Sequence, residues 1–371
     1  MSKRKNTGQK FTEQAKSFGR IITEDIKHGD LTTSWRQDFQ EIYHFYLDKA
    51  TKERLKTMGR AKRWIYIFFW LCKSLFLKLA PARRIMLLLG LVLMTNAVNF
   101  EFGVLQVSNL NLMGVVLVLT VLALEQKDKL LAKDELAIGR KVQKALLPTT
   151  HPLLDGWELW LYTRPANEVG GDLVDFIPLD SDALGLALGD VAGKGLGAAL
   201  LMAKLQATLR ALAPAHKKLD TLGKAVNHIL CRDGLKNRFA TLVYLQLQAH
   251  SGTVQLLNAG HMPPLLIRNG EIIELNRGGP ALGITSKAQY HQEETTINVG
   301  DWLLVYSDGL TEARDIQDRF FGDDRLKQTL LKKPWPSVEM LGRALIDAVN
   351  TFAGTARPSD DLSLILIRRI Q

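Results

Sequence analysis

Four short turns in the sequence place aspartate beside glycine or serine, so that carboxylates from distant parts of the chain could meet. They are VGGD at 169–172, GDVAGKG at 189–195, YSDGLTEA at 306–313 and PSDDLSLIL at 358–366. Asp190 and Asp308 each follow an apolar run typical of a strand, and Asp360 precedes another. Glycine lets the backbone turn sharply and lets an ion or a substrate come close. Taken singly, each turn is more often structural, but the four together form a candidate site.

Clustered carboxylates raise one another's pKa values unless a cation neutralises them. Oxygen ligands without Cys or His partners favour Mg²⁺ or Mn²⁺ over zinc. The two cysteines, Cys72 and Cys231, lie far apart and indicate neither a zinc site nor a disulfide framework. The residues therefore predict a carboxylate-bound binuclear metal site. They leave open whether that site serves a phosphatase, a nuclease or a phosphotransferase.

The elements that must position these turns follow Pro148. Apolar runs predict strands at Trp157–Tyr162, Ala183–Gly189, Phe239–Gln248, Thr253–Leu257, Trp302–Ser307 and Asp361–Ile367. Helices are expected at Gly197–Leu212, Leu219–Cys231 and Ser337–Phe352, and Asn269-Gly270 predicts a hairpin turn. Hairpins mixed with helices, without regular strand–helix alternation, predict an α+β sandwich rather than a doubly wound sheet.

The net charge of +10 is concentrated near the start of the chain. Residues 1–84 hold 19 Lys or Arg against 8 Asp or Glu, so the remainder is close to neutral. A basic block beside apolar runs favours anionic lipid headgroups over DNA, and a solvated tail is the alternative. We expect a basic cytoplasmic arm over residues 1–63 and a membrane-associated region over residues 64–124.

Within that region, residues 64–79 predict an interfacial helix, and Ile85–Val104 and Val104–Leu124 predict two transmembrane helices. Their purely apolar cores are shorter than the roughly 20 residues that a crossing helix needs, so a buried hairpin is the alternative. The connection Glu101–Asn111 has no Lys or Arg, whereas both flanks are rich in them. The positive-inside rule then places both ends of the chain in the cytoplasm, at the inner membrane.

A charged linker helix is expected over residues 125–147. Leu124, Leu131, Ile138 and Ala145 recur every seven residues, and Pro148 ends the helix. The heptad is imperfect, because Asp134 and Glu135 stand where a second apolar residue should fall. A homodimeric signalling helix and a single surface helix fit this pattern equally well.

A series of sequence blocks resembles one family in order over about residues 138–369. The blocks are IGRKVQKALLP, RPANEVGGDLVDFI, LGDVAGKGLGAALLMA, FATLVYLQL, LLNAGHMPPLLI, GGPALGI, LLVYSDGLTEA, FGDDRL and DDLSLILIR. They look like the SpoIIE-type branch of the PPM, or protein phosphatase 2C-like, serine/threonine phosphatases. The resemblance implies a phosphatase domain over 148–371 with an α-β-β-α sandwich fold, preceded here by the helical membrane hairpin and the linker helix.

The same resemblance implies the site. Asp172 and Asp190 would be the catalytic pair and bind two Mn²⁺ or Mg²⁺ ions, with further ligands from Asp308, Asp360 and the backbone carbonyl of Val191. Asp360 is preferred to Asp361 because the family's pair usually ligates through its first member. The implied mechanism is direct hydrolysis, in which the two ions activate a water for in-line attack on phosphorus.

Two positions depart from the family pattern. Lys194 stands where the family commonly has His, and Ala192 replaces the usual Ser. Lys194 could contact phosphate or simply face solvent. His261 is a candidate acid, although a hydrogen-bonding turn histidine is the more common role.

The leading hypothesis is a membrane-tethered phosphatase that acts on phosphoserine or phosphothreonine of a partner protein, possibly an anti-sigma-factor antagonist of the STAS type. A catalytically silent signalling module is the first alternative, and the four intact aspartates argue against it. A carboxylate-metal nuclease is the second. The near-neutral charge after residue 84 argues against nucleic acid as a partner.

Overall fold

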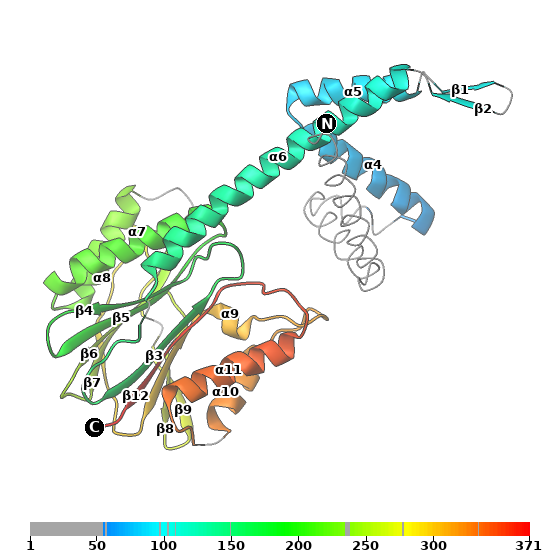
Figure 1. Cartoon of the computed structure of the whole chain (residues 1–371). Helices are drawn as coiled ribbons and strands as arrows, with labels where there is room; N and C mark the ends of the chain where they lie inside the picture. Colours follow the sequence, from blue (N-terminus) through cyan, green and yellow to red (C-terminus); the bar gives the residue numbers. More distant parts are fainter. Residues whose placement is uncertain are drawn as a thin grey trace, which may run out of the picture. The chain divides into compact units, whose positions relative to one another are not determined.

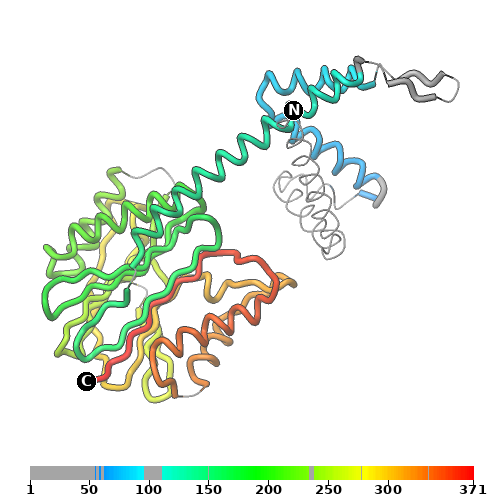
Figure 2. Tube along the Cα trace, viewed as in Figure 1, coloured from blue at the N-terminus to red at the C-terminus, as the bar shows by residue number. Residues whose placement is uncertain are grey.

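The computed structural model describes residues 55, 58–95, 98–101, 104–107, 109–148, 150–233, 238–276, 278–332 and 334–371. These residues form two compact units, one that ends at Lys129 and one that runs from Leu130 to Gln371 (Figure 1, Figure 2). The boundary falls within a single long helix, α6 (Asn109–Leu146). Most of the predicted basic arm, residues 1–63, lies outside the described residues.

The second unit contains two five-stranded antiparallel sheets. The first sheet has the strand order β10-β7-β6-β5-β4, and the second has the order β3-β12-β11-β8-β9. The strands are β3 (Trp157–Arg164), β4 (Leu173–Pro178), β5 (Ala183–Val191), β6 (Ala240–Gln248), β7 (Thr253–Ala259), β8 (Leu265–Arg268), β9 (Glu271–Glu274), β10 (Glu293–Thr296), β11 (Trp302–Tyr306) and β12 (Leu362–Arg369).

The central strands of both sheets bury both faces. In β5, Leu186 packs into the core between the sheets, whereas its neighbour Ala187 packs into the core beneath the covering helices. In β12, Ile365 faces the first sheet and Leu364 faces the helices on the other side. Successive side chains of a strand point to opposite faces, so a strand between two apolar layers has a nearly continuous apolar sequence. This explains why ALGLAL and LSLILI lack polar alternation.

Helices cover the outer face of each sheet (Figure 1). On the first sheet lie α7 (Leu196–Leu212), followed by the short turn η1 (Ala213–Ala215), and α8 (Leu219–Asp233). On the second lie α10 (Gly322–Leu331) and α11 (Val338–Ala353), and the short α9 (Asp308–Thr311) follows β11. The predicted α-β-β-α sandwich is therefore confirmed.

Local sequence signals located most of these elements. The three predicted helices agree with α7, α8 and α11 to within two residues at each end. The predicted hairpin turn is present, with positive φ values of 53° at Asn269 and 80° at Gly270. The sequence patterns did not predict β4, β10 or α10. The segments EETT in β10 and GDDRLKQTLL in α10 are mostly polar, so their sequences lack the apolar pattern that predicts a strand or a helix.

The first unit contains α4 (Arg60–Lys78), α5 (Pro81–Thr95) and a two-stranded ladder of β1 (Val98–Glu101) and β2 (Val104–Val107). A Cβ atom added to Gly90 of α5 would lie 3.1 Å from the carbonyl oxygen of Gly114 in α6, so glycine permits this close helix approach. Two expected boundaries were wrong. The first apolar helix ends at Thr95 rather than Val104, and the second is continuous with the linker helix, because nothing in 109–146 breaks the helix.

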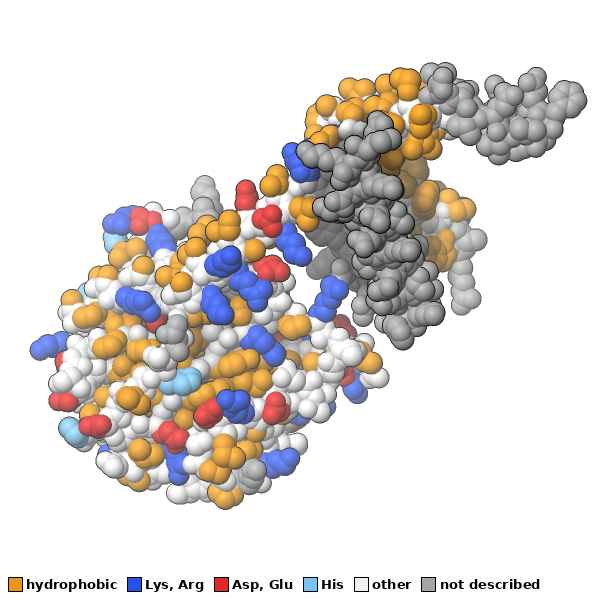
Figure 3. All heavy atoms as spheres, viewed as in Figure 1, with side chains coloured by type: hydrophobic (Ala, Val, Ile, Leu, Met, Phe, Trp, Pro, Cys, Tyr) orange, Lys and Arg blue, Asp and Glu red, His pale blue; other side chains and the backbone are white. Residues whose placement is uncertain are grey.

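Many apolar side chains of α5 and of the first half of α6 are exposed, including Leu88, Leu89, Val92, Leu112 and Leu119. Figure 3 shows hydrophobic side chains gathered over this part of the first unit, whereas charges of both signs are interspersed on the visible face of the second. Among the described residues, the one stretch that satisfies the length and hydropathy required of a membrane span is Leu196–Ala215. That stretch comprises α7 and η1, and the inner side of α7 packs into the core of the second unit.

Gly342 of α11 provides a test of the packing on the second sheet. A Cβ atom at this position would overlap the ring of Trp160, which is 7% exposed. Glycine to alanine in a helix interior normally stabilises by about 1 kcal/mol. Here we expect Gly342→Ala to lower the free energy of unfolding by about 1–3 kcal/mol through overpacking. Urea unfolding followed by circular dichroism measures this.

Trp160→Phe should relieve part of the loss when it is combined with Gly342→Ala, because the smaller ring leaves room for the methyl group. An unchanged or higher stability of Gly342→Ala would contradict this packing.

Candidate metal centre

The register of the strands brings the four predicted aspartates to one end of the sandwich. In the first sheet Leu173 pairs with Gly189, so Asp172 and Asp190 are adjacent positions at the same strand ends. In the second sheet Tyr306, near the end of β11, pairs with Leu364, near the start of β12. Asp308 follows β11 and Asp360 precedes β12, so both lie at this same end of the sheet. Each sheet thus contributes two carboxylates.

Electrostatic coupling shows that the two pairs are neighbours. The pKa of Asp190 is raised to about 6, first by burial and then by the negative charges of Asp308 and Asp360 from the opposite sheet. The pKa of Asp308 is also raised, by burial and then by the charge of Asp360. Like charges raise one another's pKa values only when they are close. The four turns therefore form one anionic site.

Asp172 is the most enclosed of the four. Its side chain is buried, at 5% exposure, and its Oδ2 atom has no hydrogen-bond partner. Burial and then the charge of Asp190 raise the pKa of Asp172 well above its usual value. A buried carboxylate oxygen without a partner is costly unless the group is protonated or a cation contacts it.

The adjacent Asp360 and Asp361 have different surroundings. Asp361 is buried, and its carboxylate accepts hydrogen bonds from the backbone N–H groups of Ala166 (2.8 Å), Gly171 (2.6 Å) and Asp172 (3.3 Å). Asp360 is partly exposed, and its Oδ2 atom lies 3.0 Å from the Nζ atom of Lys194. Asp361 therefore fixes the 166–172 loop, while the carboxylate of Asp360 faces Lys194, and the preference for Asp360 as a ligand stays a prediction.

Glycines make room for these contacts. A Cβ atom at Gly170 would lie 2.5 Å from Asp361 Oδ2, and one at Gly171 would lie 3.1 Å from the carbonyl oxygen of Val191. The Val191 carbonyl thus lies against the loop that carries Asp172.

The residues suit hard divalent cations. Within the described part of the chain, no three His, Cys, Asp or Glu side chains are grouped closely enough to hold a metal ion by themselves. The carboxylates line the site from two sides, and their donor atoms are all oxygen. Mg²⁺ retains several water ligands and is often held by only one or two carboxylates, so an open all-oxygen site of this kind is compatible with it.

His261 lies below this site rather than in it. It is buried; its Nδ1 atom is 2.7 Å from Thr241 Oγ1 and its Nε2 atom is 3.1 Å from the carbonyl oxygen of Tyr306. Burial lowers the pKa of His261 to about 4. A neutral imidazole that donates from Nε2 and accepts at Nδ1 satisfies both contacts. His261 thus links the two sheets, which supports the structural role over that of an acid.

Sequence reasoning missed Gln143, near the end of α6. Its side-chain amide donates to the carbonyl oxygen of Gly170 (2.7 Å) and accepts from the Gly170 N–H group (3.0 Å). Gln206 of α7 donates to the carbonyl oxygen of Leu146 in the same part of α6 (2.8 Å). The end of the linker helix is therefore hydrogen-bonded to the loop that carries Asp172. Only the tertiary structure could identify a lone glutamine in a charged helix as this contact.

The sequence is similar to those of several known proteins. The chain is 30% identical over 279 residues to Protein IcfG of Synechocystis sp. (strain ATCC 27184 / PCC 6803 / Kazusa). The matched region covers 67% of this chain and 44% of Protein IcfG. It is 25% identical over 239 residues to phosphoserine phosphatase RsbU of Bacillus subtilis (strain 168), covering 64% of this chain and 70% of RsbU. The chain thus spans less than half the length of Protein IcfG.

Solved structures share the fold. The SiaA-PP2C domain of Pseudomonas aeruginosa superimposes with a TM-score of 0.56 at 19% identity, covering 66% of this chain and 99% of that domain. The RsbU and RsbW domains of Rv1364c from Mycobacterium tuberculosis give a TM-score of 0.51 at 26% identity, covering 61% of this chain and 63% of that one.

The family model described as Stage II sporulation protein E (SpoIIE) matches residues 180–370, about half of the chain. The matched range contains Asp190, Asp308 and Asp360, whereas Asp172 and the end of α6 precede it. With the two-sheet sandwich and the carboxylates gathered at its end, this match shows that the chain belongs to the SpoIIE family.

Proposed function

We propose that the chain is a metal-dependent protein phosphatase that hydrolyses phosphoserine or phosphothreonine on a partner protein. The observation that carries the proposal is the gathering of Asp172, Asp190, Asp308 and Asp360 from two sheets into one anionic site. The relative named phosphoserine phosphatase RsbU supports the reaction class.

In this proposal Asp172 and Asp190, with the Val191 carbonyl, hold the metal pair from the first sheet, and Asp308 and Asp360 hold it from the second. When bound, two Mn²⁺ or Mg²⁺ ions supply an activated water and neutralise charge on the phosphoryl group. The chain's own contribution is to keep four carboxylates fixed in place despite their mutual repulsion. Asp361 and Gln143 fix the Asp172 loop from two directions.

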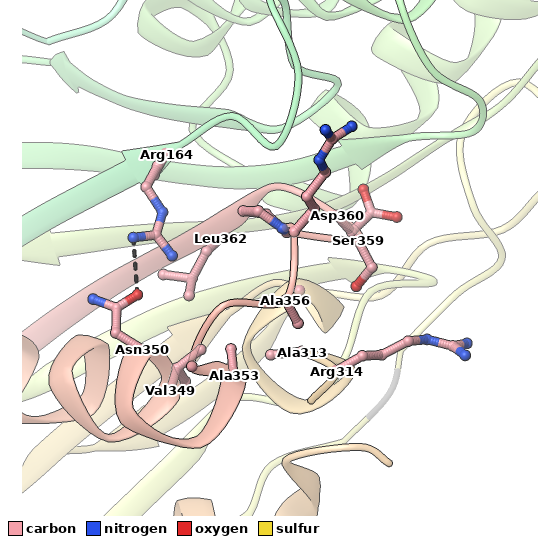
Figure 4. Close-up of a pocket in the computed structure, with 14 residues that line it drawn as sticks. Arg164, Ala313, Arg314, Val349, Asn350, Ala353, Ala356, Ser359, Asp360 and Leu362 are labelled. Carbon is pink, nitrogen blue, oxygen red and sulfur yellow. Dashed lines mark hydrogen bonds between the residues drawn. The ribbon is translucent and has the colours of Figure 1, made fainter. Parts of the chain in front are cut away.

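A pocket of about 390 Å³ beside Asp360 suits the residues that flank a phosphoserine. Its lining includes Arg164, Arg314 and Arg357, together with Ser359. Figure 4 shows Arg164 directed toward Asn350, to which it is hydrogen-bonded at 3.0 Å, and Asp360 at the edge of the same pocket. Arg314 is ion-paired with Asp318, but Arg164 and Arg357 on the pocket lining favour a substrate with acidic residues near the phosphorylated side chain.

The exposed apolar faces of α5 and α6 support membrane attachment of this phosphatase, with both ends of the chain in the cytoplasm at the inner membrane. A two-helix hairpin with a connection free of Lys and Arg fits this placement. Association through α6 would place two phosphatase units side by side, and an STAS-type protein remains the proposed substrate. A catalytically silent module is the alternative function, and it gives no reason for the unpartnered Oδ2 atom of Asp172.

Asp190→Asn and Asp308→Asn are expected to abolish Mn²⁺-dependent phosphate release from a phosphoserine peptide. Because burial and neighbouring charges raise the pKa of both groups, each ionised carboxylate opposes folding above that pKa when metal is absent. In EDTA at pH 7 both variants should therefore melt at the same temperature as the wild type or higher. Calorimetry and phosphate release on the same samples measure this.

Asp361→Asn is the matched comparison, because the same substitution weakens a carboxylate that accepts three backbone hydrogen bonds. It should lower the free energy of unfolding by about 1–3 kcal/mol with or without Mn²⁺. Full turnover of the wild type in excess EDTA, or wild-type turnover by Asp190→Asn, would refute the metal assignment.

Arg164→Gln tests the pocket. We expect a roughly threefold higher KM for a phosphoserine peptide with acidic flanks. The reason is that an exposed ion pair between the arginine and the peptide contributes up to about 1 kcal/mol, which the substitution removes. The same peptide with neutral flanks and p-nitrophenyl phosphate should be hydrolysed as by the wild type. Arg343→Gln, on the exposed pair with Glu339 in α11, is the control. Equal effects on all three substrates would count against a flank-binding pocket.

Membrane attachment can be tested by labelling single cysteines in a chain that lacks Cys72 and Cys231. We expect Ser17→Cys in the basic arm and Ser286→Cys in the phosphatase unit to react only from the cytoplasmic side, and Ser108→Cys in the connection only from the other side. Recovery of the full chain in the supernatant without detergent, or labelling of Ser17→Cys and Ser286→Cys from opposite sides, would contradict the hairpin.

A further inference from the structure

Lys194 reaches into the anionic site from the loop that follows β5. Its Nζ atom lies 3.0 Å from Asp360 Oδ2 and donates a hydrogen bond to the carbonyl oxygen of Ser359 at 2.6 Å. Its positive charge also lowers the pKa of Asp308, against the larger effects of burial and neighbouring carboxylates that raise it. From the sequence, Lys194 could either contact phosphate or face solvent. A lysine that only faced solvent would not make these contacts with Asp360 and Ser359.

The loop that carries Lys194 is held in place by hydrogen bonds at Ala192, two residues before it. Ala192 donates its N–H group to the Phe239 carbonyl (2.9 Å) and accepts a hydrogen bond from Arg238 Nη1 (2.7 Å). Gly193 and Gly195 have φ values of 110° and 75°, and a Cβ atom at Gly193 would overlap the Arg238 guanidinium. Residues with side chains rarely adopt such φ values. The backbone therefore presents the Lys194 side chain toward Asp360.

Lys194 contacts the carboxylate oxygen of Asp360 that accepts no backbone hydrogen bond. Oδ1 accepts the backbone N–H group of Asp361 at 3.0 Å, whereas Oδ2 lies 3.0 Å from Lys194 Nζ. A divalent ion bound through this oxygen would meet the ammonium group at the same position. Two cations cannot share one oxygen at contact distance without strong repulsion.

We propose that Lys194 is a tethered cation of the metal centre, which neutralises Asp360 until a divalent ion takes its place. The inference rests on the proposed function, because it requires that Asp360 be a metal ligand. Metal binding then includes the displacement of the ammonium group, which weakens the observed affinity by the free energy of the displaced pair. The lysine also reduces carboxylate repulsion in the metal-free chain.

The test is Mn²⁺ binding by the full chain in detergent, measured by isothermal titration calorimetry without substrate, together with the melting temperature in EDTA. For Lys194→Gln we expect a dissociation constant for Mn²⁺ that is about two- to fivefold lower than that of the wild type, as an exposed ion pair allows. Its melting temperature in EDTA should fall. Lys327→Gln, which removes the same charge from a surface pair with Glu274 (3.0 Å), should change neither quantity.

A Lys194→Gln chain that binds Mn²⁺ with wild-type affinity would overturn the proposal. If the KM of that chain for a phosphopeptide also rises, Lys194 contacts the substrate phosphate and not the metal ligand. In an Asp360→Asn background, Lys194→Gln should no longer tighten Mn²⁺ binding. If it still does, the lysine acts elsewhere and the proposal fails. Absence of Mn²⁺ binding by the wild type would instead refute the proposed function itself.

Discussion

Repulsion between carboxylates at one end of the sandwich is the constraint on which the rest of the structure depends. Asp172 and Asp190 come from the first sheet, Asp308 and Asp360 from the second, and burial together with their mutual proximity raises the pKa values of three of them. Such a group opposes folding when it is ionised and unpaired. The apolar core between the sheets must therefore hold these strand ends together.

The surrounding hydrogen bonds fix the loops that the sheets alone would leave free. Asp361 binds three backbone N–H groups of the 166–172 loop, Gln143 binds Gly170, and Arg238 binds the loop after β5. None of these three side chains is among the proposed ligands. Each positions a loop that carries a residue of the site, so their loss would loosen the site without removing a ligand.

The contact between Gln143 and Gly170 also gives α6 a defined place in the second unit. The last turns of this helix are hydrogen-bonded both to the Asp172 loop and, through Gln206, to α7. A change in the position of the last turns of α6 would act first on the loop that carries Asp172, the most buried of the four site carboxylates.

The sequence by itself determined which residues are candidates for the site, and it determined most of the helices and strands. Glycine-flanked aspartates next to apolar runs are local patterns, and so are the hairpin at Asn269-Gly270 and the amphipathic helices α7, α8 and α11, because turn geometry and one-sided burial depend on neighbouring residues. The preference for Asp360 over Asp361 came from family resemblance, whereas the hydrogen bonds of Asp361 to the 166–172 loop appear only in the fold.

Tertiary structure alone decided which groups meet across the two sheets. Asp361 contacts a loop about 190 residues earlier in the chain, Gln143 contacts a glycine in a different element, and Lys194 meets Asp360 from the opposite sheet. Tertiary structure also decided the bounds of the apolar helices in the first unit. The residues of β1 and β2, which the sequence pattern predicted to be helical, pair with each other as strands. Contacts between residues far apart in the chain leave no periodic trace in the sequence around either partner, because they depend on how whole elements pack.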